Sequence, residues 1–236
     1  MLSVSVVIPM HNEEANAEKT IRELSKTFKQ NKLEGEVIVV DDRSTDSTPL
    51  ILNRLARKNK LLRVIHRKGD LKVVEVGYAV RDGIALAKYD VVVVMMGDLS
   101  DDPKDISRMV REIEKGYDFV VGSRFCEGGK AYDYPLNKLI ANRLCNSFTK
   151  LIFNLDTNDI SNAFKSYRRS ALRAIEIESR QFNFTVEIPL KLIKKGYCYT
   201  QIPVKWFGRK RGVAKLKVWS SAFAYFKTVL KIFLNK

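Results

Sequence analysis

Short apolar runs rich in β-branched residues alternate with stretches of helical periodicity through the first half of the chain. The apolar runs are Val4–Ile8, Glu36–Val40, Leu62–Ile65, Val91–Met95 and Phe119–Val121. Helical spacing of apolar residues occupies the stretches between them, at about 13–30, 47–58, 76–87 and 103–115. Continuous apolar strands separated by helices are typical of a parallel sheet that is covered on both faces. The pattern therefore predicts an α/β fold with a mostly parallel sheet flanked by helices.

The pattern becomes less regular after Arg124. The elements expected there are a helix at about 136–153, a strand at 163–168, a helix at 183–195, a strand at 197–204 and a basic loop at 205–217. The end of the chain, from 216 to 234, is apolar at helical spacing but interrupted by Lys227 and Lys231. Because no stretch has the composition of a linker, we predict one domain, residues 1–216, followed by a C-terminal amphipathic helix, residues 217–236.

The charge of the chain favours anionic partners. Lysine and arginine number 42 against 27 aspartates and glutamates, a formal net charge of +15. No acidic residue follows Glu187, whereas basic residues continue to the end of the chain. This asymmetry indicates a specific surface for phosphates or acidic lipid headgroups. No DNA- or RNA-binding motif accompanies the charge, so we expect no nucleic acid partner.

The cysteines and the N-terminal residues indicate the cellular compartment in which we expect the protein. Cys126, Cys145 and Cys198 are far apart and have neither metal-site nor disulfide spacing, which favours a reducing compartment. The N-terminal apolar run lacks the basic region and cleavage site of a signal peptide and is typical of a first strand. No apolar run reaches the roughly 20 residues of a membrane span.

Polar clusters follow several of the predicted strands. They are His11–Glu13, Asp41–Asp46, Asp98–Asp102 and Gly122–Arg124. Each cluster alone is typical of turns and helix caps. In an open α/β sheet, however, the carboxyl ends of the strands meet at one edge, where ligands bind. Carboxylates gathered there repel one another unless a cation offsets them, so we expect a polar ligand held with Mg²⁺ or Mn²⁺. Neither phosphate-loop fingerprint is present, and no Ser-His-Asp set is evident.

An ordered set of motifs resembles family 2 glycosyltransferases with the GT-A fold, and in particular the dolichol-phosphate mannose synthase-like enzymes. The motifs are I-P-x-x-N-E at 8–13, V-V-D-D-x-S-x-D at 39–46, G-x-A-x-R-x-G at 77–83, a DxD-like segment at Gly97-Asp98, G-S-R at 122–124, D-I-S-N-A-F at 159–164, I-P-V at 202–204 and R-x-x-G-x-A-K at 209–215. Each motif is weak alone, but their order is specific and covers residues 4 to 216. The resemblance implies a Rossmann-like GT-A domain and a nucleoside diphosphate sugar, GDP- or UDP-linked, as donor.

The resemblance also implies roles for individual residues. The base and ribose would be bound by Pro9, His11, Glu13, Asp41 and Asp42, and Arg81 belongs to the same nucleotide-binding set. Asp98 would hold the metal and the diphosphate. Arg209 and Lys215 match basic residues of a loop that closes over the donor, and with Asp98 and Arg124 they form the expected catalytic set. Ser123, Arg124, Lys138 and Asn142 lie where related enzymes bind the acceptor phosphate.

Three positions depart from the family pattern. Met96 replaces the first aspartate of the DxD motif, and its thioether does not suit a hard cation. Ser100 stands where glutamine is common, and Ala214 stands where serine is usual. Either metal binding rests on Asp98 with the donor phosphates and Asp101, or it is weak.

The expected reaction follows from this site. We expect an inverting transfer of a sugar, mannose or glucose, from the nucleotide to a polyprenyl or dolichyl phosphate. A phosphate monoester with a second pKa of about 6 is largely dianionic at neutral pH, so no general base is required. Arg124 and Lys138 would orient it. Two alternatives remain open: a family 2 enzyme with a non-lipid acceptor, and a nucleotide-sugar-binding protein whose metal site is disabled at Met96.

The C-terminal helix allows two interpretations. It could pack in a core or a dimer, or it could lie in the membrane interface with its lysines against anionic headgroups. A lipid-linked acceptor favours the second interpretation. We therefore expect peripheral association with the cytoplasmic side of a membrane.

Overall fold

A seven-stranded sheet lies at the centre of the protein. The computed structural model describes residues 2–70, 74–209, 211–212 and 218–235. The strands of the sheet are β1 (Val4–Met10), β2 (Gly35–Asp41), β3 (Leu62–His66), β4 (Val91–Val94), β5 (Phe119–Ser123), β7 (Lys165–Arg168) and β8 (Tyr199–Pro203). Their order is β3-β2-β1-β4-β7-β5-β8. Neighbouring strands are parallel except for β7, which is antiparallel to both β4 and β5. The prediction of a mostly parallel sheet is confirmed.

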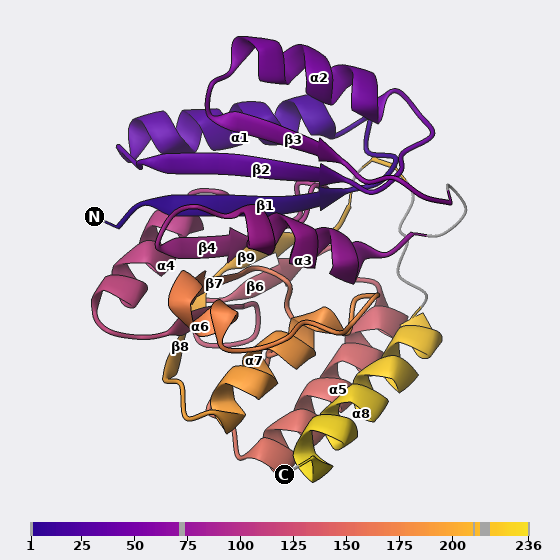
Figure 1. Ribbon diagram of the computed structural model, residues 1–236. Coiled ribbons are helices and arrows are strands. Elements are labelled where there is room, and N and C mark those ends of the chain that lie inside the picture. Colours follow the sequence, from indigo (N-terminus) through magenta and orange to yellow (C-terminus); the bar gives the residue numbers. More distant parts are fainter. Residues whose placement is uncertain (1, 71–73, 210, 213–217, 236) are drawn as a thin grey trace.

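Helices cover both faces of this sheet (Figure 1). The helices of the described chain are α1 (Ala17–Gln30), α2 (Thr48–Lys58), α3 (Val76–Leu86), α4 (Asp105–Glu114), α5 (Leu136–Phe153), α6 (Arg169–Arg173), α7 (Phe184–Lys194) and α8 (Val218–Leu234). Alternate residues of a strand point to opposite faces. Accordingly Val6 and Ile8 of β1 pack with α1 and α4, whereas Val7 packs with α3 and α7. The sheet is therefore packed on each face by a separate apolar cluster, and this packing fixes the positions of the strands.

A small second sheet was not predicted. β6 (Lys130–Tyr132) pairs in parallel with β9 (Lys205–Phe207), and the Tyr132 and Phe207 rings stack with centroids 5.0 Å apart. The first part of the expected basic loop, 205–217, is therefore a strand. Three-residue strands have no readable periodicity, and their pairing is decided by the approach of segments far apart in sequence.

Helices α5 and α8 lie side by side at the edge of the molecule farthest from β3 (Figure 1). Ala141, Cys145 and Ala222 form a small buried cluster between them, and the rings of Phe148 and Phe226 meet edge to face at 4.9 Å. No described helix is both long and apolar enough to cross a membrane. The C-terminal helix thus contacts the rest of the fold through one side, and much of its other side is exposed.

Candidate functional site

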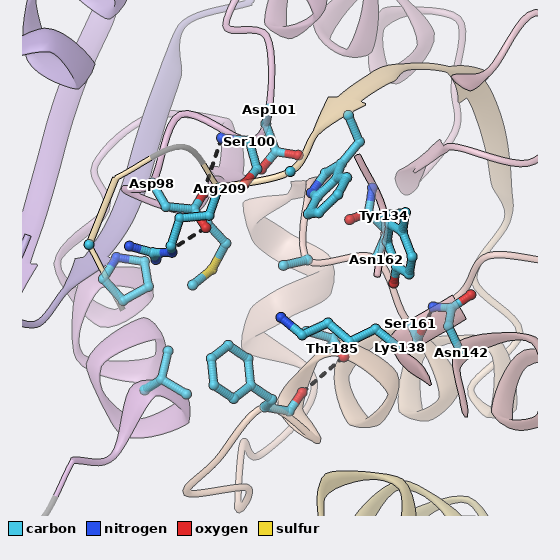
Figure 2. Close-up of a pocket in the computed structure, with 18 of the residues that line it drawn as sticks. Asp98, Ser100, Asp101, Tyr134, Lys138, Asn142, Ser161, Asn162, Thr185 and Arg209 are labelled. Carbon is cyan, nitrogen blue, oxygen red and sulfur yellow. Dashed lines mark hydrogen bonds and ion pairs between the residues drawn. The ribbon is translucent and has the colours of Figure 1, made fainter. Parts of the chain in front are cut away.

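A cavity of about 710 Å³ opens beyond the carboxyl ends of the strands. Its wall combines segments from both halves of the chain and includes Pro9, His11, Glu13, Asp42, Asp98, Ser100, Asp101, Arg124, Tyr134, Lys138, Asn142, Ser161, Asn162, Trp206 and Arg209. Figure 2 shows Asp98 and Arg209 at one side of this cavity, with Tyr134, Lys138 and Asn142 at the other. The edge that the sequence predicted therefore holds one continuous site with two polar regions.

Arg209 joins two carboxylates in the first region. Its Nη1 and Nη2 donate to the two carboxylate oxygens of Glu13, each at 2.8 Å, and Nη2 also donates to Asp98 Oδ2 at 3.2 Å. Burial lowers the pKa of Arg209, but its bonds to Glu13 and the charge of Asp98 outweigh burial, so that the pKa is raised overall. Three residues expected to act on the donor are thus brought together, although Lys215 lies outside the described residues.

Asp101 is a second carboxylate on the cavity wall. Within the described part of the chain, its Oδ1 is buried and has no hydrogen-bond partner, and the same is true of the adjacent Ser100 Oγ. Burial, together with the charge of Asp98, raises the pKa of Asp101 to about 7. A buried carboxylate oxygen without a partner is costly, and a ligand that supplies a cation or a donor group would relieve that cost.

The residues present fit a divalent cation. No three His, Cys, Asp or Glu side chains cluster as ligands within the described part of the chain. Mg²⁺, however, is commonly held by one or two protein carboxylates together with substrate phosphates. Asp98 and the unpartnered Oδ1 of Asp101 meet that requirement, whereas Met96 supplies no oxygen. These two aspartates are the residues that would hold the cation.

The nucleotide-binding predictions separate into two groups. Pro9, His11, Glu13 and Asp42 line the cavity, and the backbone oxygen of Asp42 lies 2.8 Å from His11 Nδ1. The Asp42 carboxylate is buried, and it accepts hydrogen bonds from Arg43, from Arg67 and from the backbone nitrogen of Glu75. Asp42 therefore shapes the pocket through the segments that it ties together.

Asp41 and Arg81 do not line the cavity. The Asp41 carboxylate lies 2.7 Å from His66 Nδ1 and accepts the backbone N–H of Ser44 at 3.2 Å. Arg81 stacks over the Tyr78 ring at 4.0 Å and pairs with Asp82. In this structure both side chains are engaged outside the cavity.

Arg124 is the buried centre of the second region. It donates from Nε and Nη2 to the two oxygens of Asp159, at 2.9 and 2.7 Å. Rings of Phe125, Tyr134 and Trp206 surround the guanidinium, with centroids between 5.4 and 5.9 Å from its carbon. Burial opposes the charge of Arg124, but the contact with Asp159 outweighs it and raises the pKa of the guanidinium. Its charge is thus fixed at the cavity wall.

The other predicted acceptor residues differ in position. Lys138 extends from α5 into the cavity (Figure 2), and no carboxylate pairs with its amine among the described residues. Asn142 donates to Ser161 Oγ at 3.0 Å, while its own Oδ1 is buried and finds no partner in the residues that the structure describes. Ser123 is fully buried outside the cavity wall, where its Oγ accepts the backbone N–H of Cys126.

Several site residues were not among the predicted ones. Asp159, Tyr134, Ser161, Asn162 and Trp206 all lie at or directly behind the second region. The D-I-S-N-A-F motif was a signal for Asp159, Ser161 and Asn162, because its order resembled the family pattern. Nothing in the local sequence distinguished Tyr134 and Trp206 from ordinary apolar residues.

The comparisons with known proteins identify the family. The model of the family described as Glycosyl transferase family 2 matches residues 5–176. Polyprenol monophosphomannose synthase of Mycolicibacterium smegmatis is 26% identical over 226 residues, which cover 94% of this chain and 84% of that protein. Undecaprenyl-phosphate mannosyltransferase of Micrococcus luteus is 26% identical over 223 residues, which cover 91% of this chain and 88% of that protein.

Solved structures share the fold. Glucosyl-3-phosphoglycerate synthase from Mycobacterium tuberculosis, in complex with phosphoglyceric acid, matches with a TM-score of 0.75 at 18% identity, covering 98% of this chain and 80% of that one. The same enzyme was crystallised with Mn²⁺, UDP and phosphoglyceric acid, and that structure matches with a TM-score of 0.74 at 18% identity, covering 99% and 79% of the two chains. At this identity the likeness establishes the GT-A-like fold. Since the family match spans well over half of the chain, the protein belongs to glycosyl transferase family 2 and is a glycosyltransferase.

Proposed function

We propose that the protein transfers a sugar, mannose or glucose, from a GDP- or UDP-linked donor to a polyprenyl or dolichyl phosphate, with inversion at the anomeric carbon. The observation that carries this proposal is the division of one cavity into two regions. One contains Asp98, Asp101 and Arg209, and the other contains Arg124 and the amine of Lys138. A donor diphosphate and an acceptor phosphate each find a region of matching chemistry there.

The two named relatives support the choice of acceptor and sugar. Their names specify a polyprenol or undecaprenyl phosphate and a mannosyl group, and they match this chain over more than nine-tenths of its length. We further propose that residues 1–216 form the catalytic domain and that residues 217–236 form an accessory helix.

The chemistry follows from the charges of the site. A bound divalent cation would neutralise charge that develops on the leaving diphosphate. Arg209, next to Asp98, is placed to donate to the same phosphate oxygens. The acceptor oxygen forms its bond to the anomeric carbon while the bond from that carbon to the diphosphate breaks, and a single displacement of this kind inverts the configuration.

The second region would orient the acceptor. Lys138 supplies one positive charge at the cavity wall, and Arg124, which donates to the Tyr134 hydroxyl, supplies another. The acceptor phosphate is largely dianionic near pH 7, so it attacks without a general base. Lys138 is carried by α5, one of the two helices with exposed apolar surfaces.

Those surfaces favour a membrane as the place of reaction. On α5 the exposed apolar residues are Leu136, Ile140, Leu144 and Leu151. On α8, among the residues whose side chains are described, they are Phe223, Leu230, Phe233 and Leu234. Both sets follow helical spacing, and the exposed Lys227 lies among the second. Such a pair of helices suits peripheral binding to an anionic, cytoplasmic membrane surface, with aromatic side chains at the acyl boundary.

A transfer assay tests the proposal. Purified protein is incubated with radiolabelled GDP-mannose, UDP-glucose or UDP-N-acetylglucosamine and with polyprenyl phosphate in vesicles, with and without Mn²⁺. We expect organic-phase label with one donor, an inverted anomeric configuration by NMR, and loss of label in Asp98→Asn. Absence of lipid-linked label with every donor, despite nucleotide binding, would instead indicate a non-lipid acceptor or a site without turnover.

A further inference from the structure

Arg209 contacts two carboxylates of the expected donor site at the same time. Its guanidinium makes two 2.8 Å hydrogen bonds to Glu13 and a 3.2 Å bond to Asp98 Oδ2. The side chain of Arg209 is only 16% exposed, as is that of Asp98. The Arg209 guanidinium thus lies between two carboxylates that belong to the expected donor site.

The backbone just before Arg209 is hydrogen-bonded to a neighbouring segment, and the Glu13 carboxylate has a second partner. Gly208 donates its N–H to the Tyr132 oxygen at 2.9 Å, and a Cβ at Gly208 would lie 2.4 Å from the Asp133 oxygen. On the other side, Asn16 donates to Glu13 Oε2 at 2.8 Å, which fixes the carboxylate that receives the guanidinium. Arg209 is therefore positioned by contacts that do not depend on a ligand.

The guanidinium and a divalent cation would compete for Asp98 in this arrangement. A hard cation requires the lone pairs of a carboxylate oxygen, and Asp98 Oδ2 already accepts a hydrogen bond from Arg209. Two positive charges at one partly buried carboxylate also repel each other strongly. Metal binding to Asp98 is therefore weakened while Arg209 stays at this carboxylate.

We propose that Arg209 acts as a built-in substitute for the metal while the site holds no donor, and that it makes metal binding depend on the donor. This inference rests on the proposed function, because the phosphates of a nucleoside diphosphate give the displaced guanidinium new acceptors. Arg209 then moves from the carboxylates to phosphate oxygens, for which its planar fork is well suited. Without a nucleotide, Arg209 and the metal compete for Asp98.

Mn²⁺ binding to the nucleotide-free protein tests this proposal directly. Electron paramagnetic resonance reports free Mn²⁺ during titration of wild type, Arg209→Gln and Arg211→Gln. Arg211 is exposed on the same loop, and its substitution removes the same charge. We expect Arg209→Gln to bind Mn²⁺ about tenfold more tightly than wild type, and Arg211→Gln to stay within about twofold. Adding GDP or UDP should tighten Mn²⁺ binding to wild type much more than to Arg209→Gln.

Two further measurements make the result decisive. Thermal unfolding establishes that each variant is folded, and Asp98→Asn in the Arg209→Gln background should abolish the gain in affinity. Equal Mn²⁺ affinities for Arg209→Gln, Arg211→Gln and wild type would overturn the proposal, as would a gain that survives Asp98→Asn. The Mn²⁺ titration does not measure sugar transfer, so its result is independent of the transfer assay described above. If the protein shows the expected Mn²⁺ binding but forms no lipid-linked label in that assay, only the proposed function is refuted.

Discussion

Arg124 and Asp159 form a two-point ion pair in the interior of the protein. Two guanidinium nitrogens lie 2.7 and 2.9 Å from the two carboxylate oxygens, and the backbone N–H of Arg124 donates to the same carboxylate at 2.8 Å. The Asp159 side chain is completely buried. This carboxylate therefore both neutralises and orients the guanidinium at the wall of the cavity.

Asp159→Asn should destabilise the protein strongly. The change leaves the buried guanidinium without its counter-charge, which typically costs about 3–5 kcal/mol of unfolding free energy. Urea denaturation measures this cost. Glu18→Gln is the control, because it breaks the exposed ion pair with Arg54 and should cost less than about 1 kcal/mol. Equal stabilities of the two variants would contradict the importance given to the buried pair.

Asp101 should make stability depend on pH. Its folded-state pKa is raised from 3.8 to about 7, so between these values the unfolded chain loses a proton that the folded protein retains. The contribution of this group to stability is therefore present at low pH and is lost as pH rises through that window, by up to about 1.4 kcal/mol per unit.

The test of this pH dependence compares wild type with Asp101→Asn at pH 4.5 and 7.5, by urea unfolding with EDTA present. Asp101→Asn should gain stability relative to wild type as pH rises. Asp90→Asn, at an exposed position, should leave the wild-type dependence unchanged. A constant difference between wild type and Asp101→Asn at the two pH values would show that Asp101 is already ionised in the folded protein.

Lys138→Ala should weaken binding of the acceptor without affecting the donor. A charge-assisted hydrogen bond contributes about 1.5–3 kcal/mol, so we expect KM for polyprenyl phosphate to rise about tenfold or more. KM for the donor should remain within about twofold, because Lys138 lies in the region of the cavity away from Asp98. Steady-state kinetics with a short-chain acceptor in detergent measures both constants.

The matched control for this experiment is Lys150→Ala, an exposed lysine near the other end of α5. It removes the same charge from the same helix but leaves the cavity intact. If both variants raised the acceptor KM equally, Lys138 would contribute only to the overall charge of the helix.

The exposed apolar surfaces of α5 and α8 should bind anionic membranes. Leu144 and Phe223 are 56% and 72% exposed. Changing both to glutamate adds negative charge and removes apolar contact, so co-sedimentation with phosphatidylglycerol vesicles should fall at least about fivefold. Leu50→Glu on α2, at a residue that is 75% exposed, is the control and should bind as wild type does. A similar loss in the control would indicate a general charge effect.

The local sequence was sufficient to predict most of the regular elements. Each of the five strands expected in the first half is present, and the helix expected at about 136–153 is α5 (Leu136–Phe153). Periodicity reveals such elements because each buries one face or one stripe of its own residues. The order of polar motifs at the strand ends likewise indicated the family and the edge of the sheet on which the site lies.

Tertiary structure decided what the local sequence could not. Asp41 and Asp42 are adjacent and chemically identical, yet only Asp42 lines the cavity, because Asp41 is directed to His66. Similarly, β6 and β9 exist through their mutual pairing, and Arg209 reaches Glu13 across 196 positions of sequence. Composition and spacing indicate which chemical groups a chain carries. The direction in which each side chain points depends on contacts between distant segments, and these contacts form only when the sheet and its helices pack together.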